Sequence, residues 1–289
     1  MSTHHTNPTG HSEPAGQPWQ CFDRAARGYE RHARVQPAIA RHLAALIRTH
    51  ALPRQARILE IGCGTGLLTQ ALASHYPMAR WLLTDLSPTM LEQARRKLPP
   101  GEHNQCRVMD GEHPAFPPSQ PRFDLICSSM ALQWFRHPAE GLARLARWLA
   151  PGGMLAVAVP TMGSLAEWRQ AHTALCLAAD TLAFPAAEQL QAAAAGLEGA
   201  CSTRSYTDQY RNAREFLLGL KGAGATTPQT HRRPLGAGTL RAVCREFDRQ
   251  GARCTYQVTF GLWHRPGAPM KPQHPPCASR LAPTPDRQP

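Results

Sequence analysis

The segment Arg57–Gly66, with the sequence RILEIGCGTG, constrains the fold of this chain more than any other. A short apolar run ends around Glu60, and glycines then take alternate positions at Gly62, Gly64 and Gly66. This pattern predicts a β-strand that runs into a tight turn and then a helix over residues 67–74. Glycine lets the backbone approach a bulky ligand closely, and a helix N-terminus offers free N–H donors. The segment therefore predicts a ligand-binding strand–turn–helix unit.

Strand and helix patterns alternate along the chain from this segment onward. Apolar runs typical of parallel strands occur at residues 57–61, 80–84, 105–109, 123–128 and 154–159. Such alternation predicts a parallel sheet with right-handed crossovers. Residues 201–210 predict a sixth strand, and the alternating residues 254–263 predict an antiparallel last strand. The expected fold is α/β: a Rossmann-like, seven-stranded, mostly parallel sheet.

Other regions set the expected organisation of the chain. Residues 20–50 predict N-terminal helical structure, and residues 162–200 predict a helical insertion after the fifth strand. The insertion is expected to open on a capping box made by Ser164 and Glu167. Residues 1–18 and the Pro-rich residues 265–289 carry little that could be buried. We expect one domain over residues 19–264 between two disordered tails.

Composition limits the classes of protein to which this chain can belong. The 289 residues contain no apolar stretch of membrane-spanning length, so no membrane association is expected. The nine cysteines form no C-x-x-C pair, which favours reduced thiols in the cytoplasm and gives no sign of a metal site. The net charge of +12 favours an acidic partner. Because the chain shows no zinc or helix-turn-helix signature, nucleic acid is not the expected partner.

Acidic residues stand at the ends of three successive predicted strands, as Glu60, Asp85 and Asp110. Ligands of open α/β sheets bind at the carboxyl ends of the strands. A carboxylate such as Asp85 can accept hydrogen bonds from both hydroxyls of a ribose. Each acid alone could simply cap a helix or a turn, whereas the three together predict a nucleotide-like ligand.

The G-x-G-x-G spacing with a preceding acid resembles the S-adenosylmethionine (SAM) loop of class I methyltransferases, and it differs from the G-x-G-x-x-G spacing of nicotinamide sites. The resemblance implies SAM as cofactor. The glycines would wrap its methionine part, Glu60 would meet its ammonium group, and Asp85 with Leu86 would hold the ribose. Asp110 and Gly111 would contact the adenine, with Ser128 and Ser129 near the sulfonium. The cofactor-binding residues expected are Glu60, Gly62, Gly64, Gly66, Asp85, Leu86, Asp110, Gly111 and Ser128.

A narrower resemblance rests on motifs spread over residues 22–263. The segment FDRAA at residues 22–26, with Tyr29 and Gln36, resembles the N-terminal signature of the malonyl-acyl-carrier-protein O-methyltransferases of biotin synthesis. The segments SSMALQW at residues 128–134 and LLGLKGAGA at residues 217–225 resemble later motifs of the same family. The region after the third predicted strand and residues 228–240 depart from the family pattern.

The family resemblance implies methylation of the free carboxylate of a malonyl thioester. A carboxylate is already ionised near neutral pH, so no general base is expected. Alignment of the reacting atoms and exclusion of water are the tasks left to the enzyme. We expect Tyr29, Gln133 and Trp134 to shape the acceptor pocket, although Trp134 could equally be a core residue. Lys221 is a candidate contact for the malonyl carboxylate, or else a solvated helix residue.

The resemblance also implies an acyl-carrier protein as partner, and carrier proteins are acidic. Candidate basic contacts are Arg24, Arg27, Arg31, Arg34, Arg232 and Arg233. Each of these arginines could also belong to an ordinary solvated face. Two alternatives remain open from the sequence. One is a class I methyltransferase acting on another small carboxylic acid or on a quinone, and the other is a non-catalytic SAM-fold or RNA-binding module.

Overall fold

The computed structural model describes residues 18–101, 103–225 and 235–267. Most of the two expected tails lies outside these described residues. Arg232 and Arg233, within the internal gap 226–234, lie outside them as well. The helices and strands, with two short 3-10 turns marked η, are α1 (Pro18–Ala25), η1 (Ala26–Gly28), α2 (Tyr29–His32), α3 (Gln36–Arg48), β1 (Arg57–Ile61), α4 (Leu67–Ala73), β2 (Arg80–Asp85), α5 (Pro88–Arg95), β3 (Gln105–Val108), β4 (Phe123–Ser129), η2 (Leu132–Trp134), α6 (Pro138–Ala146), β5 (Leu149–Pro160), α7 (Ala166–Thr173), α8 (Ala187–Ala193), β6 (Glu198–Gln209), α9 (Ala213–Gly222), α10 (Ala237–Arg249) and β7 (Arg253–His264).

The strands form one seven-stranded sheet in the order β3-β2-β1-β4-β5-β7-β6. The pairs that join β1 to β5 are parallel, whereas β7 is antiparallel to both of its neighbours. The predicted Rossmann-like sheet with an antiparallel last strand is confirmed. Strands β2 and β3 lie on one side of β1, and β4 and β5 lie on its other side, so the strand order reverses between β1 and β4. Open α/β sheets bind ligands at such a point.

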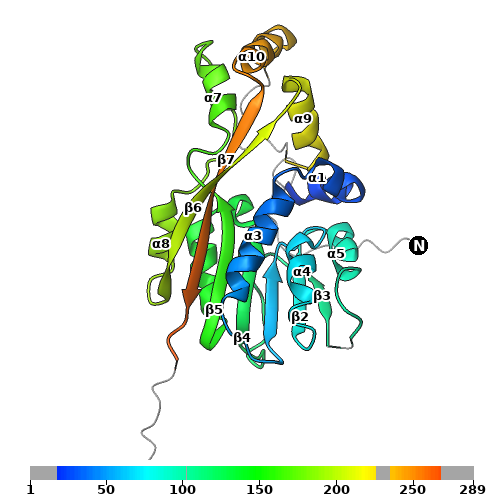
Figure 1. Ribbon diagram of the computed structural model, residues 1–289, viewed down its shortest axis with the longest axis vertical. Helices are drawn as coiled ribbons and strands as arrows, with labels where there is room; N and C mark the ends of the chain where they lie inside the picture. The colour runs from blue at the N-terminus through cyan, green and yellow to red at the C-terminus, as the bar shows by residue number, and fades with distance from the viewer. Residues whose placement is uncertain (1–17, 102, 226–234, 268–289) are drawn as a thin grey trace, which may run out of the picture.

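Helices cover both faces of the sheet (Figure 1). Alternate residues of each central strand belong to different core clusters, as Leu125 and Cys127 face α3 and α4 while Ile126 faces α6. Strands buried on both faces read as continuous apolar runs, which is why β4 could be recognised in the sequence. The result is a three-layer α/β/α arrangement that leaves only the strand ends open to a ligand.

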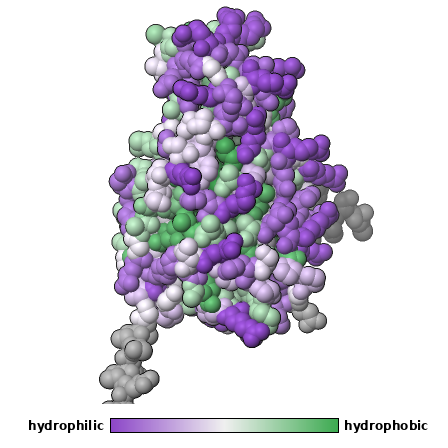
Figure 2. All heavy atoms as spheres, in the orientation of Figure 1, coloured by the Kyte–Doolittle hydropathy of each residue, from purple (hydrophilic) through white to green (hydrophobic). Residues whose placement is uncertain are grey.

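The ribbon β6–β7 extends beyond the parallel strands and carries α7, α9 and α10 at one end of the molecule (Figure 1). These helices pack around Trp168, Phe216 and Phe247, whose ring centroids lie 5.1 to 5.4 Å apart and which belong to the same buried cluster as the residues between α3 and the sheet. On the face drawn in Figure 2, this end is covered mainly by hydrophilic residues. The helices therefore form a small cap above the carboxyl ends of the strands.

The expected N-terminal helical structure is confirmed, as α1, η1, α2 and α3 with a break at residues 33–35. One expectation about a helix start was wrong. Ser164 and Glu167 form no capping box. Ser164 exchanges hydrogen bonds with the backbone of Gln257, and Glu167 accepts hydrogen bonds from the N–H and hydroxyl of Thr255. Both side chains instead tie the start of α7 to β7.

Candidate active site

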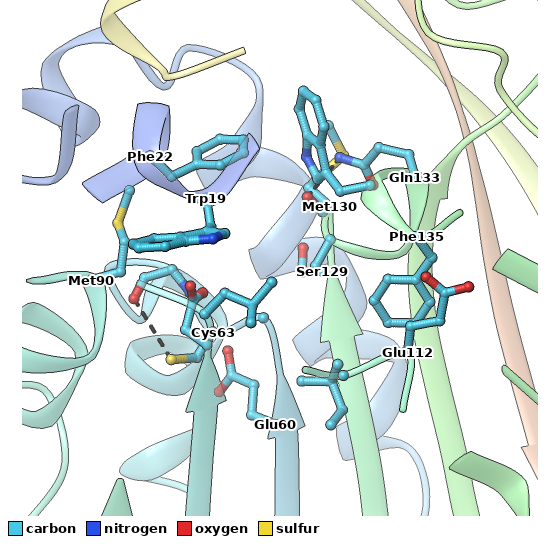
Figure 3. A pocket seen from close by; sticks show the side chains of 18 of the residues that line it. Trp19, Phe22, Glu60, Cys63, Met90, Glu112, Ser129, Met130, Gln133 and Phe135 are labelled. Atoms are coloured by element: carbon cyan, nitrogen blue, oxygen red, sulfur yellow. Dashed lines mark hydrogen bonds between the residues drawn. The ribbon is translucent and has the colours of Figure 1, made fainter. Parts of the chain in front are cut away.

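A cavity of about 670 Å³ lies at the carboxyl ends of β1, β2 and β4. Its walls bring together ten of the residues expected to bind the cofactor or the acceptor. They are Tyr29, Glu60, Gly62, Gly64, Asp85, Leu86, Asp110, Gly111, Gln133 and Trp134. We call this space the first cavity. Figure 3 shows side chains of its lining, with Glu60 low in the view and Trp19 and Phe22 of α1 above.

The loop between β1 and α4 forms the floor of the first cavity. Gly62 and Gly64 have positive φ angles of 60° and 53°, which favour glycine. A Cβ on Gly62 would lie 2.4 Å from the Cβ of Ala131, so a side chain there is also sterically excluded. A Cβ on Gly64 would meet nothing within 4 Å, because the backbone there faces open space. The loop thus offers bare backbone to a ligand.

Asp85 braces this loop from the end of β2. Its carboxylate accepts hydrogen bonds of 2.9 Å from the N–H groups of Gly64 and Ser87. Burial raises the pKa of Asp85 above its ordinary value, although these N–H donors act in the opposite direction. The carboxylate is therefore held rigidly at the wall of the cavity, where a ligand hydroxyl could reach its remaining lone pairs.

Glu60 lies beneath the loop and is almost completely buried. Its carboxyl group accepts a 2.6 Å hydrogen bond from the hydroxyl of Thr69 on α4. Burial is the largest cause that raises the pKa of Glu60, to about 8. Burial therefore favours the neutral acid, whereas a cation bound beside it would favour ionisation.

The wall beyond β3 depends on Glu112, a buried residue that sequence reasoning missed. Its carboxylate accepts hydrogen bonds from the N–H groups of Arg136 (2.7 Å) and His137 (2.8 Å). The neighbouring Asp110 accepts the N–H of Glu112 and faces His113. Only the buried state of Glu112 distinguishes it from an ordinary surface acid, and that state is invisible in the sequence. Glu112 fixes the chain between η2 and α6, which bounds the cavity.

Helix α1 covers the first cavity from above (Figure 3). Asp23 of α1 holds this helix against the N-terminus of α5. Its carboxylate accepts hydrogen bonds from the hydroxyl of Ser87 (2.6 Å) and the N–H of Thr89 (3.1 Å). Phe22 meets Trp134 edge to face, with ring centroids 4.9 Å apart. These contacts close the cavity on the side opposite the strand ends.

A second cavity, of about 650 Å³, lies between α1 and α2 on one side and the cap helices on the other. The two cavities adjoin, because both are lined by Phe22, Tyr29, Gln36, Met130, Gln133, Trp134 and Leu182. Most of its other lining side chains are apolar, such as Trp168, Leu217 and Leu220. Tyr29, Gln133 and Trp134 thus stand where the two spaces meet.

Tyr29 at the junction, and Tyr210 and Tyr256 in the second cavity, are neutral at physiological pH. Burial raises the pKa of Tyr29 well above its ordinary value of 10, with smaller contributions from Asp85 and Glu30. Burial also raises the pKa of Tyr210 and of Tyr256, which both line the second cavity. A neutral phenol can donate its proton in a hydrogen bond to an anionic oxygen.

Three expected cofactor or acceptor residues do not line the first cavity. Gly66 faces α5, where a Cβ would lie 2.9 Å from the Cα of Ala94, so it permits close helix packing. The hydroxyl of Ser128 donates to the carbonyl of Ile61, and its neighbour Ser129 lines the cavity instead. Lys221 is exposed on α9 and lines neither cavity, which argues against its contact with an acceptor carboxylate.

The described arginines of the expected docking surface are not alike. Arg24, Arg27 and Arg31 are exposed on the surface of α1, η1 and α2. Arg34 pairs with Asp208 at 2.9 Å and with Glu215 at 3.4 Å, and it lies 4.7 Å from the ring centroid of Tyr210. Arg34 therefore joins α2 to the cap, and its charge is already matched inside the protein.

Within the described ranges, no helix has the length and apolar character needed to cross a membrane. The same part of the chain contains no group of three or more His, Cys, Asp or Glu side chains placed to share a metal ion.

The sheet order and the glycine-floored cavity at its switch point define a methyltransferase of the class I fold. Residues 59–155 match the family model described as a methyltransferase domain. The YcgJ protein of Bacillus subtilis has the same fold, with a TM-score of 0.54 and 14% identity over 78% of this chain and 99% of that one.

Within that class, the chain belongs to the malonyl-[acyl-carrier protein] O-methyltransferase family. The protein of that name from Magnetococcus marinus is 34% identical over 261 residues, which cover 89% of this chain and 95% of the relative. The biotin biosynthesis bifunctional protein BioCD of Bordetella avium is 48% identical over 246 residues. That match covers 85% of this chain and 51% of BioCD, so the chain spans about half the length of the bifunctional relative.

Proposed function

We propose that this protein transfers the methyl group of SAM to the free carboxylate of a malonyl thioester carried by an acyl-carrier protein, as a step of biotin synthesis. The observation that carries the proposal is the junction of two cavities at Tyr29, Gln133 and Trp134. A cofactor in the first cavity and an acceptor in the second would meet there. SAM held in the first cavity would supply an electrophilic methyl carbon; the carboxylate oxygen would take it, and the C–S electron pair would stay on sulfur.

The residues of the first cavity fit this cofactor. Gly64 leaves open space above the loop, Asp85 presents an anchored carboxylate, and Glu60 is a buried acid that a bound ammonium group would ionise. We propose that Gly62 and Gly64 hold the methionine part, Asp85 and Leu86 the ribose, and Asp110 and Gly111 the adenine. The cavity lining and the pattern of strand-end acids support these placements.

The acceptor needs alignment and shielding from water, and this chain supplies groups for both. Phe22 and Trp134 form an apolar wall at the junction of the cavities. Tyr29 is a neutral donor there, so it can hold a carboxylate oxygen without removing its charge. We propose that Tyr29 orients the acceptor carboxylate. No general base is required, since the acceptor is ionised before it binds.

The exposed Arg24, Arg27 and Arg31 support an acidic carrier protein as partner, since they lie on the elements that cover the cavities. Positive charge near an active site speeds encounter with an acidic partner. The cysteines of the described residues are all free thiols, which supports the proposal of a cytoplasmic enzyme.

Methyl transfer from isotope-labelled SAM to malonyl-acyl-carrier protein tests the proposal. We expect label on the carrier, in a linkage that mild alkali removes as methanol. Acetyl-acyl-carrier protein is the matched control, because it has the same thioester and carrier but no free carboxylate. Label on both carriers, or on neither, would contradict the proposal. Faster transfer to free malonate than to the carrier would show that the acceptor is a small acid.

A further inference from the structure

The junction of the cavities contains two buried hydrogen-bond acceptors that the protein leaves unused. The side-chain oxygens Oε1 of Gln36 and Gln133 have no hydrogen-bond partner among the described residues. Both glutamines line the first and the second cavity. An unpaired buried acceptor is costly, so acceptors of this kind point to a ligand that brings its own donor.

The orientation of the Gln133 amide is fixed by the chain. Its Nε2 donates a 2.7 Å hydrogen bond to the carbonyl of Met130, a residue held at a positive φ of 59°. Only a nitrogen can donate to that carbonyl, so the unpaired atom is the oxygen. Gln133 is 7% exposed, which leaves water little access to this acceptor.

The surroundings favour a neutral N–H donor over a cation. Arg34 and Asp208, which line the second cavity, already match each other, and Asp180, a further acid of this wall, also has an interaction partner. Its tyrosines are neutral at physiological pH, and most of the remaining wall is apolar. A bound ammonium group has the Glu60 carboxyl group available in the first cavity, so it does not need an amide oxygen.

We propose that the second cavity receives the amide-bearing arm of the acyl thioester, and that Gln36 and Gln133 accept hydrogen bonds from its amide N–H groups. This inference rests on the proposed function. A thioester of a pantetheine-type arm carries an amide N–H a few bonds from sulfur, whereas free malonate has none. Sites that hydrogen-bond a substrate N–H reject analogues that lack it, because the buried acceptor is then left unpaired. The two glutamines would therefore select for the arm as well as for the malonyl group.

Two small thioesters test this inference. One is malonyl-N-acetylcysteamine, and the other is its analogue in which CH2 replaces the amide N–H. We expect the wild-type kcat/KM to favour the amide by about tenfold or more, the effect of one unpaired buried acceptor. Because this probe has a single amide N–H, the preference should shrink at least threefold in whichever of Gln36→Leu and Gln133→Leu removes the oxygen that accepts it. Gln250→Leu is the matched control, because Gln250 also has a buried unpaired Oε1 but lines neither cavity, and it should keep the full preference.

Equal wild-type rates on the two thioesters would overturn the inference, as would an unchanged preference in both cavity variants. Weaker SAM binding by the variants with no change in preference would also overturn it, because the acceptors would then serve the cofactor. Turnover of malonyl-acyl-carrier protein without turnover of the small amide would assign recognition to the carrier surface and reject the inference alone. Absence of transfer to any malonyl thioester would instead reject the proposed function.

Discussion

At the scale of single residues, Asp85 joins the glycine loop to the ligand space. Its carboxylate receives the N–H of Gly64, and it lines the first cavity. We expect Asp85→Asn to weaken SAM binding about tenfold or more, since hydrogen bonds to a charged acceptor are roughly twice as strong as neutral ones. Isothermal titration calorimetry measures the change in Kd.

The chain offers a matched control for this substitution. Asp124 accepts a 2.7 Å hydrogen bond from the N–H of Arg57 at the opposite end of β1. Asp124→Asn replaces a comparable carboxylate acceptor by an amide oxygen away from the cavity, so it should leave the Kd for SAM within about twofold, as expected of a distant and independent site. An equal loss in both variants would mean that Asp85 acts through stability alone.

Glu60 gives the free protein a distinctive pH dependence. Its pKa is about 8 when folded and near its ordinary value of 4.5 when unfolded, so the folded chain binds the extra proton between these values. Stability contributed by the neutral acid is therefore fully present below pH 4.5 and is lost as pH rises to about 8. The associated slope is up to about 1.4 kcal/mol per pH unit.

We expect Glu60→Gln to remove this contribution, because an amide does not titrate. Urea unfolding between pH 5.5 and 8.5, without SAM, should give a flatter pH profile for the variant than for the wild type. Parallel profiles would show that Glu60 is ionised in the folded protein at all of these pH values.

At the same scale, the sequence predicted which residues stand at the strand ends better than it predicted which side chains face the cavity. Glu60, Gly62 and Asp85 were found because strand ends and glycine spacing are local signals. Ser128 and Ser129 alternate in β4, and the sequence could not tell which one faces the cavity. The partner of Glu112 lies far along the chain, so its role depends on tertiary contacts that no local pattern encodes.

At the scale of elements, α1 acts as a cover held by the hydrogen bonds that Asp23 accepts from Ser87 and Thr89. The Ser87 hydroxyl is the largest cause that lowers the pKa of Asp23 below its ordinary value, so the contacts persist at neutral pH. We expect Asp23→Ala to speed hydrogen exchange of α1 about tenfold, the effect of losing one such contact. Mass spectrometry of peptides from α1 measures this change.

Amides of β4 and β5 provide the internal control for that experiment, because they lie in the sheet centre away from α1. They should exchange as in the wild type. Faster exchange throughout the protein would indicate global destabilisation, and the cover would then have no independent motion.

Elements were predictable where one local pattern decided them. Ser87 and Asn212 accept a backbone N–H at the N-termini of α5 and α9, the position that these residue types favour. Ser164 and Glu167 had an equally good capping pattern, but β7 offered stronger partners from a distant part of the chain. The break between α2 and α3 is followed by Pro37 in the first turn of α3, where a missing N–H is tolerated, so a local signal for a new helix start was present in the sequence.

At the scale of the whole molecule, the second cavity could not be foreseen. Its walls come from α2, η2, the cap helices and β7, which are brought together only by the complete fold. The excess of positive charge was visible in the composition. The composition did not show that Arg34 is paired with acids, whereas Arg27 and Arg31 lie exposed on the surface.

This difference leads to a prediction for the carrier. Reversal of two exposed charges in Arg27→Glu/Arg31→Glu should raise the KM for malonyl-acyl-carrier protein about tenfold at low salt, with a smaller effect above about 0.15 M salt. The KM for malonyl-N-acetylcysteamine should not change. Arg80→Glu/Arg253→Glu is a charge-matched control at exposed sites outside both cavity linings. Equal effects of the two double variants would remove the case for a docking surface on α1 and α2.

The place of β7 between β5 and β6 has a consequence for how the chain is made. During translation, the twelve residues of β6 are made before β7, which is their only described strand neighbour and ends at His264. Until then, both β5 and β6 have unpaired backbone groups, which invite association with other nascent chains. Premature stop codons anywhere before His264 should therefore yield aggregates rather than shorter working enzymes.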